Sequence, residues 1–498
     1  MSGCVTVRGE RFLFEPPRAE IAQIELMGSS SLQFGSESNG IQALGFAALL
    51  GFVYAFISRV LDLHFSYLHL PLVLGATTGI CAIISGGLFK ALSTRVGILY
   101  VGLTCWFAAG VPFAYWRGGS AGQVASWLRT LVIWAFLVGL TLTCRQCKLL
   151  LNTFFLAAAT AALMALIGSG AEAQGRLSLE RGELANANYF ALELLIALPL
   201  AWRFYSGGGR PGVLRRVLAA GLGGLILLAL FETGSRAGLY SLGVMVLLVV
   251  LRVDLARKIL IALAVGVLFV SMFAVLPGSL RERYSTVSSM GARGDRSAAA
   301  SVLERQRVLR QSISITLTHP IFGVGLGNFA PYVFQVNKDL GQAKEAWFGT
   351  HNTYTQMSCE AGIPALLIFL GIIVATWRSL TRLIRATRHD DRSEARDIYY
   401  TAQAVQVCLG SFLFCLAFIH LAYDILPHML LGVALAFVFT GERELRDLDA
   451  QQLPPESGNY RGDREILFSG GSLAPQVSGT VRRGAAAWSI TADGRRTA

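Results

Sequence analysis

Long apolar blocks, repeated along most of the chain, limit what this sequence can fold into. Each block is about 20 residues long, the length that an α-helix needs to cross the hydrocarbon core of a bilayer. Charged residues make up 15% of the chain and the mean hydropathy is +0.53, whereas soluble proteins carry about 25% charged residues. The blocks therefore predict an all-α integral membrane protein rather than a set of soluble domains.

The apolar blocks predict twelve transmembrane helices. Their approximate ranges are 41–58, 66–85, 96–116, 124–144, 149–170, 188–205, 214–231, 235–251, 257–277, 361–379, 403–422 and 425–440. The resulting domains are a cytoplasmic N-terminal segment (1–40), nine spans (41–277), a large external loop (278–360), three spans (361–440) and a disordered cytoplasmic tail (441–498).

The placement of the basic residues predicts the orientation. The net charge of +12 gathers largely in short loops, so it favours a membrane topology and no nucleic-acid partner. The segments at 203–216 and 378–396 are rich in arginine, and short basic loops stay on the cytoplasmic side. Both termini are therefore predicted inside, and loop 278–360 outside.

Loop 278–360 is long enough to expect a function. Residues 302–320 repeat apolar side chains at helical spacing, so they predict an amphipathic helix that ends at Pro320 and the following glycines. The run GVGLG at 323–327 resembles a phosphate-binding turn only weakly, because no strand precedes it. We expect a tight turn that packs beside the helix after His351, which Thr350 is placed to cap.

Three ionisable residues on the outer side are candidates for chemistry, because charges are costly in an apolar setting. Arg236 opens the span 235–251, Arg305 lies in the predicted loop helix, and His351 precedes the span 361–379. Arg236 and Arg305 each carry a planar guanidinium that suits a diphosphate. His351 is the natural general base near neutral pH. The alternatives are a lipid anchor for Arg236, a solvated helix face for Arg305 and a purely structural His351.

The eight cysteines show no disulfide framework. Cys144 and Cys147 form a CxxC pair, a spacing common in metal and redox sites. No second pair accompanies it, so the sequence predicts no metal site.

Several segments resemble the O-antigen ligase and polymerase superfamily. The strongest match is HPIFGVGLGNF followed by HNTYTQMSCEAGIPALL, and TGSRAG, GRLSLERGELANANYFALELL and VPFAYWRGGS resemble further elements of the superfamily. Ala187 stands where the family has a proline, and Ala114 and Arg117 also depart from its pattern. The resemblance covers residues 110–365 approximately.

The resemblance implies a GT-C-like membrane fold and a metal-independent, inverting glycosyltransferase that uses no cofactor. The site would face the periplasm from the bacterial inner membrane, and the donor would be a glycan on undecaprenyl diphosphate. By resemblance, Arg236 and Arg305 bind the diphosphate, and His351 activates or positions the acceptor hydroxyl. Further expected substrate contacts are Arg176, Asn186, Asn188, Asn352, Tyr354 and Gln356.

Three functions remain open from the sequence. The first is a ligase that transfers finished O-antigen onto lipid A–core, and the second is a polymerase of O-antigen or exopolysaccharide repeat units. The third is a transporter or flippase of lipid-linked polysaccharide, although such proteins often show paired halves and broken helices at the midplane. Polar groups that gather in one loop favour chemistry at one membrane face.

Overall fold

The computed structural model describes residues 40–61, 66–168, 175–179, 183–206, 212–285, 296–339 and 349–452. The chain divides into two compact units, residues 1–448 and residues 449–498. The candidate site lies in the first unit, and residues 449–452, the end of helix α18, are the described part of the second. The predicted N-terminal segment, apart from Gly40, and the predicted tail beyond residue 452 lie outside the described residues.

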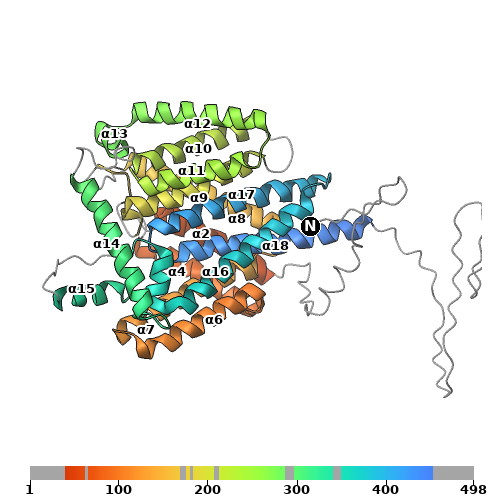
Figure 1. Ribbon diagram of the computed structural model, residues 1–498. Coiled ribbons are helices and arrows are strands. Elements are labelled where there is room, and N and C mark those ends of the chain that lie inside the picture. The colour runs from red at the N-terminus through yellow and green to blue at the C-terminus, as the bar shows by residue number, and fades with distance from the viewer. Residues whose placement is uncertain are drawn as a thin grey trace, which may run out of the picture. The chain divides into compact units, whose positions relative to one another are not determined.

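The described regular structure is helical (Figure 1). The helices before the predicted large loop are α2 (Gly40–Ser58), α4 (Leu70–Ile84), α5 (Gly87–Leu92), α6 (Arg95–Gly110), α7 (Arg117–Leu140), α8 (Cys144–Ile167), α9 (Ala187–Ser206), α10 (Val213–Glu232), α11 (Arg236–Val250) and α12 (Leu255–Val275). The later helices are α13 (Gly278–Ser285), α14 (Arg296–Thr318), α15 (Phe329–Asp339), α16 (Thr353–Thr387), α17 (Ser393–Cys415) and α18 (Ile425–Gln452). Short 3₁₀ turns are η1 (Ser66–Leu68), η2 (Val111–Phe113), η3 (Glu183–Ala185) and η4 (Leu416–Phe418).

Nine helices in the described part of the chain are long and apolar enough to cross a membrane. They are α2, α6, α7, α8, α10, α12, α16, α17 and α18. Helices α4 and α11 are apolar but shorter, and α9, which contains Pro199, is not among the nine. Every predicted span therefore coincides with a helix, and the architecture fits a multi-pass membrane protein, while the count of twelve spans stays a prediction.

Two predicted boundaries near the C-terminus were wrong. Helix α17 ends at Cys415, and after η4 the chain is non-helical at 419–424, so the predicted span 403–422 is too long. Helix α18 continues to Gln452, although the sequence predicts a disordered tail from residue 441. Residues 441–452 are mostly good helix formers, and Arg443 pairs with Asp447 at 4.0 Å, one turn later.

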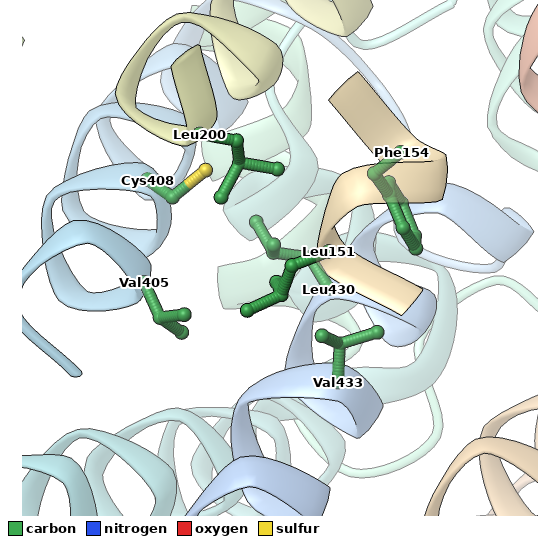
Figure 2. Close-up of a pocket in the computed structure, with 7 residues that line it drawn as sticks. All are labelled: Leu151, Phe154, Leu200, Val405, Cys408, Leu430 and Val433. Carbon is green, nitrogen blue, oxygen red and sulfur yellow. The ribbon is translucent and has the colours of Figure 1, made fainter. Parts of the chain in front are cut away.

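Large apolar side chains fill the centre of the bundle. Trp127, Trp134 and Tyr100 are fully buried, and the Tyr100 hydroxyl lies 2.8 Å from Nδ1 of His428. One small cavity of about 10 Å³ lies between α8, α9, α17 and α18 (Figure 2). Its lining is wholly apolar and consists of Leu151, Phe154, Leu200, Val405, Cys408, Leu430 and Val433. A void of this size and polarity is part of the core rather than a substrate site.

Helices α14 and α15 lie at one end of the bundle and pack against α16 (Figure 1). The amphipathic helix predicted at 302–320 is confirmed as the C-terminal part of α14. The glycine-rich turn that follows is also confirmed as a close-packed turn. Its Val324 and Gly325 amides donate to the carbonyls of Cys359 and Glu360, both at 2.9 Å.

Helix α16 is bent where that turn meets it. Gly362 has a φ of 86°, so α16 consists of two helical pieces joined at this residue. The amide of Ile363 donates to the carbonyl of Pro320 at 2.8 Å. A Cβ atom at Gly362 would overlap the carbonyl of Ile321. Glycine is therefore required here both for its backbone conformation and for the close approach of the turn.

Replacing Gly362 with alanine tests this junction. Holding a non-glycine residue in that conformation costs roughly 1–3 kcal/mol before the overlap with Ile321 is counted. We expect Gly362→Ala to lower the midpoint of thermal unfolding and the yield of monodisperse protein in detergent. Gly266→Ala is the matched control, because Gly266 lies within α12 and a Cβ there would contact nothing within 4 Å. Equal stability of the two variants would contradict the assignment.

Candidate active site

The candidate site is built around the N-terminal end of α16. The side chain of Asn352 caps this helix, because its Oδ1 accepts hydrogen bonds from the amides of Tyr354 (2.9 Å) and Thr355 (3.0 Å). The expectation that Thr350 caps the helix was wrong, since its hydroxyl instead donates to the carbonyl of Asn352 at 3.2 Å. The Asn352 carboxamide oxygen thus fixes the start of the helix directly after His351.

His351 has an uncommon backbone conformation. Its φ of 50° lies in the left-handed region, which a residue with a side chain adopts rarely and often at functional sites. The ring is half-buried and meets the ring of His420 edge-on, with 5.3 Å between the centroids. Burial, and secondly the neighbouring His420 and Arg305, lower the pKa of His351 to about 4. The imidazole is therefore neutral at pH 7 and able to accept a proton.

Arg305 lies near His351, and a shared role of the two residues in one site stays a prediction. Its charge acts on the His351 imidazole, and its own side chain on α14 is half-buried. The hydroxyls of Thr316 on α14 and Ser358 on α16 lie 2.8 Å apart, which holds the two helices together. Two of the three predicted catalytic residues are thus brought together by α14 and α16.

Arg236 is the first residue of α11 and is half-buried. The Ser235 hydroxyl caps the helix by accepting from the amide of Gly238 at 3.2 Å. The Arg236 guanidinium forms no hydrogen bond or ion pair with any residue that the structure describes. One turn later, the Tyr240 ring contacts the Phe418 ring, two residues before His420, with 6.3 Å between centroids. The start of α11 therefore lies beside the chain segment that carries His420.

Arg176 and Asn188 support the turn that precedes Arg236. The buried Arg176 guanidinium donates to the carbonyl of Thr233 at 2.9 Å and to Oδ1 of Asn188 at 3.0 Å. The Ser235 hydroxyl donates to the same Asn188 oxygen, also at 3.0 Å. Arg176 and Asn188 thus hold residues 233–235, the turn directly before Arg236. Contact of Arg176 or Asn188 with a substrate stays a prediction.

The other predicted contact residues have different positions. Asn186 is exposed and caps α9, because its Oδ1 accepts from the amide of Asn188 at 2.9 Å. The Tyr354 hydroxyl donates to the carbonyl of Leu413 at 2.7 Å, which ties α16 to α17. Gln356 alone of this group lines a cavity. Asn186, Tyr354 and Asn352 each have an observed structural role. Their contact with a substrate stays a prediction.

A polar cavity of about 220 Å³ opens beside His351. Its lining residues are Gln123, Tyr189, Gly327, Gln356, His420, Tyr423 and Asp424. His420 belongs to this lining and also contacts the ring of His351, so the predicted catalytic histidine lies next to the cavity. Amide, phenol and carboxylate groups in one cavity suit a hydroxyl-rich ligand such as a sugar.

The sequence reasoning missed the segment 419–424. Thr353 fixes it from α16, since the Thr353 hydroxyl donates to the carbonyl of Ile419 (2.7 Å) and accepts from the amide of Leu421 (3.0 Å). His420 was hidden because its neighbours are apolar and the predicted span 403–422 absorbed it. A usable signal existed: His420, Tyr423 and Asp424 are polar residues grouped close to the junction of two predicted spans.

Part of the chain matches a known protein family. Residues 221–370 match the family described as O-antigen ligase. The chain carries an O-antigen ligase domain. The match confirms the resemblance seen in the sequence, and it includes Arg236, Arg305 and His351. A search of curated proteins found no match.

The match supports an enzyme of the glycosyl-transfer type, and the matched family implies lipid-linked glycans as substrates and lipids as acceptors. The match of the O-antigen ligase domain ends at residue 370. Tyr189 and the segment 419–424, which line the cavity, therefore lie outside it, and their part in the site rests on the structure.

The lowered pKa of His351 predicts a pH profile for the O-antigen ligase domain. A histidine with its ordinary pKa of 6.5 gains a proton as the pH falls from about 8 to about 5, whereas His351, with a pKa of about 4, stays neutral. We therefore expect kcat/KM for glycan transfer, which reports the free enzyme, to stay level over this range. An inflection near pH 6.5 that disappears when His351 is replaced would contradict this expectation.

Asn188 allows the structural and substrate-binding roles to be separated. Asn188→Ala leaves the buried Arg176 and Ser235 without a shared acceptor, which should destabilise the protein by about 1–3 kcal/mol. Asn188→Asp keeps the acceptor oxygen and should retain stability. Thermal unfolding in detergent measures both variants beside the wild-type protein. If Asn188→Ala unfolds at the wild-type temperature, Asn188 has no supporting role.

Proposed function

We propose that this protein is a ligase that transfers a polysaccharide from undecaprenyl diphosphate onto lipid A–core. The observation that supports this most strongly is the grouping of Arg305 and a neutral His351 beside a polar cavity. Glycosyl transfer from a lipid diphosphate needs a cationic group that holds the leaving diphosphate and a base close to the space that receives the acceptor sugar.

Arg236 and Arg305 bind the donor diphosphate in this proposal. Each guanidinium can donate two parallel hydrogen bonds to phosphate oxygens. Their positive charges stabilise the negative charge that develops as the bond between the sugar C1 and the diphosphate breaks. Because the two arginines supply this stabilisation, we propose that the reaction needs no metal ion.

His351 takes the proton of the acceptor hydroxyl. The acceptor oxygen attacks C1 of the donor sugar, the C1–O bond to the diphosphate breaks, and undecaprenyl diphosphate leaves with the bonding electron pair. A single displacement of this kind inverts the configuration at C1. The imidazole of the free enzyme is a weak base, but a bound diphosphate brings negative charge and raises its basicity. The polar cavity holds the acceptor sugar beside it.

The orientation belongs to the same proposal. The arginine-rich segments at 203–216 and 378–396 favour the cytoplasmic side of a bacterial inner membrane. Both termini would then be inside, and α14, α15 and the start of α16 would face the periplasm. Lipid-linked glycan and lipid A–core would meet the site there, with no requirement for a nucleotide.

A repeat-unit polymerase is the second candidate, and one contact favours it. The exopolysaccharide-like segment VPFAYWRGGS (111–120) packs on the glycine-rich turn. The Tyr115 amide donates to the carbonyl of Val324 at 2.9 Å, and the Ser120 hydroxyl donates to the carbonyl of Leu326 at 3.3 Å. A motif of exopolysaccharide members thus shapes the edge of the site. A transporter would have no simple need for the neutral His351.

In vitro transfer tests the ligase proposal. Purified protein is mixed with undecaprenyl-diphosphate-linked glycan and lipid A–core in a buffer that contains a chelator and no nucleotide. We expect glycosylated lipid A–core. His351→Ala should lower kcat by about 10²–10⁴-fold, and Arg236→Ala and Arg305→Ala by about 10²–10³-fold each.

Two variants serve as matched controls in this assay. Arg310→Ala removes an exposed arginine from the same helix as Arg305, and His389→Ala removes an exposed histidine. Both should transfer at the wild-type rate. Longer lipid-linked chains formed without lipid A–core would identify a polymerase instead. Absence of turnover with either acceptor would count against both enzymes and favour a transporter.

A further inference from the structure

His420 is enclosed more tightly than a cavity-lining residue requires. A Cβ atom at Gly349 would lie 2.6 Å from Nε2 and Cε1 of its ring, so only glycine leaves room for the imidazole there. The ring of His351 meets it edge-on at 5.3 Å, and the Tyr189 hydroxyl lies 3.2 Å from Nε2. Two segments far apart in the sequence, one at Tyr189 and one at 349–351, therefore converge on one imidazole.

The contacts of Tyr189 assign the protonation of the His420 ring. The Tyr189 hydroxyl donates to the backbone carbonyl of His420 at 3.2 Å. A phenol has one proton, so Nε2 of His420 must carry a hydrogen and donate it to the Tyr189 oxygen. Nδ1 then carries a lone pair and no hydrogen. It is buried and has no hydrogen-bond partner among the residues that the structure describes.

The backbone on either side of His420 is fixed as well. Thr353 bonds to both neighbours, Ile419 and Leu421, through one hydroxyl. Gln356 accepts from the amide of Ala422 at 3.0 Å. Both Thr353 and Gln356 lie on α16, in the first turn after His351. The position of the His420 ring is thus tied to the same helix end that presents His351.

We propose that His420, held by Tyr189, is the positioning residue that fixes the His351 imidazole at the edge of the polar cavity and keeps water from its buried face. This inference rests on the proposed function, because positioning has a purpose only if His351 takes a proton. A neutral ring packed edge-on prevents rotation of its neighbour without adding a charge. Misplacement of a catalytic group by about 1 Å can cost about 100-fold in rate.

Burial, rather than the ionisable groups around the pair, keeps His420 neutral. His351, Tyr189 and Asp424 surround the cavity side, and Arg305 acts on His351 from α14. Burial lowers the pKa of His420 below its ordinary value. Both rings are therefore uncharged together at neutral pH, which allows them to lie in contact.

Replacement of the His420 ring tests the proposal through the pKa of His351. NMR titration of isotope-labelled histidine in the full-length protein measures that pKa, with the signal assigned by its loss in His351→Ala. In His420→Ala, water reaches His351, so its pKa should rise from about 4 towards 6.5. His420→Phe keeps an aromatic ring and should retain most of the lowering, because burial is its largest cause, and exposed His389→Ala should leave the pKa unchanged.

The transfer assay gives the second readout. We expect His420→Ala to lower kcat about 100-fold, with unchanged binding of undecaprenyl diphosphate, and His420→Phe to recover most of that loss. Tyr189→Phe should lower kcat in the same direction but less. Because the NMR titration needs no turnover, wild-type protein that transfers no glycan would reject the proposed function without affecting this test of the ring contact.

Three outcomes would overturn the positioning role. The first is a His351 pKa that stays near 4 in His420→Ala. The second is His420→Phe with the same kcat and pKa as His420→Ala, since the ring would then be irrelevant. The third is a loss of undecaprenyl diphosphate binding in folded His420→Ala. If His420→Ala does not fold, Tyr189→Phe decides, because a wild-type pKa and kcat there would equally reject the proposal.

Discussion

A break in an apolar helix exposes backbone groups that must find partners, and the break at Gly362 organises this structure. A bilayer offers no water to satisfy those groups, so irregular backbone is tolerated only where the protein covers it. Here the glycine-rich turn covers it, through hydrogen bonds from Val324 and Gly325 to the carbonyls before the bend. The same contact joins the segment after α14 to the helix that begins beside His351.

Part of the candidate site consists of irregular segments, and hydrogen bonds fix each of them. Residues 175–179 are fixed through Arg176, the segment before α16 through the Asn352 cap, and residues 419–424 through Thr353. Functional groups on loops are useful only when a rigid scaffold fixes them. These three contacts supply that rigidity, the Asn352 cap locally and the Arg176 and Thr353 contacts between residues far apart in the sequence.

The electrostatics of the site fit chemistry on an anion. Arg305 acts on a histidine that burial has already made neutral, so positive charge and a proton acceptor coexist without forming a second cation. A negatively charged donor would be attracted by the arginine and would also raise the basicity of His351. Binding of the donor would then increase the ability of His351 to take the proton of the acceptor hydroxyl.

Much of this arrangement could be predicted from the sequence because it depends on local pattern. Apolar blocks located the helices, helical spacing located α14, and the glycines after Pro320 located the turn. Arg236, Arg305 and His351 were chosen as candidates because charge is costly near apolar segments, and their catalytic roles stay predictions. The matched O-antigen ligase domain contains all three.

The rest depends on contacts between distant residues, which a single sequence does not display. His420 contacts Tyr189, which lies 231 positions away in the chain. Because its neighbours are apolar, the predicted span 403–422 included it. The sequence also does not show that Arg176 and Ser235 both donate hydrogen bonds to Oδ1 of Asn188, because these residues are far apart in the chain. Choosing Thr350 rather than Asn352 as the cap failed because both residue types cap helices, and only geometry separates them.

The central claim is that Arg236, Arg305 and His351 act on one lipid diphosphate. An experimental structure with undecaprenyl diphosphate bound tests it most directly. The account predicts that the two phosphates contact the guanidinium groups of Arg236 and Arg305, with the terminal phosphate facing the polar cavity beside His351. Phosphates bound away from these arginines, for example at the arginine-rich segment 378–396, would contradict it.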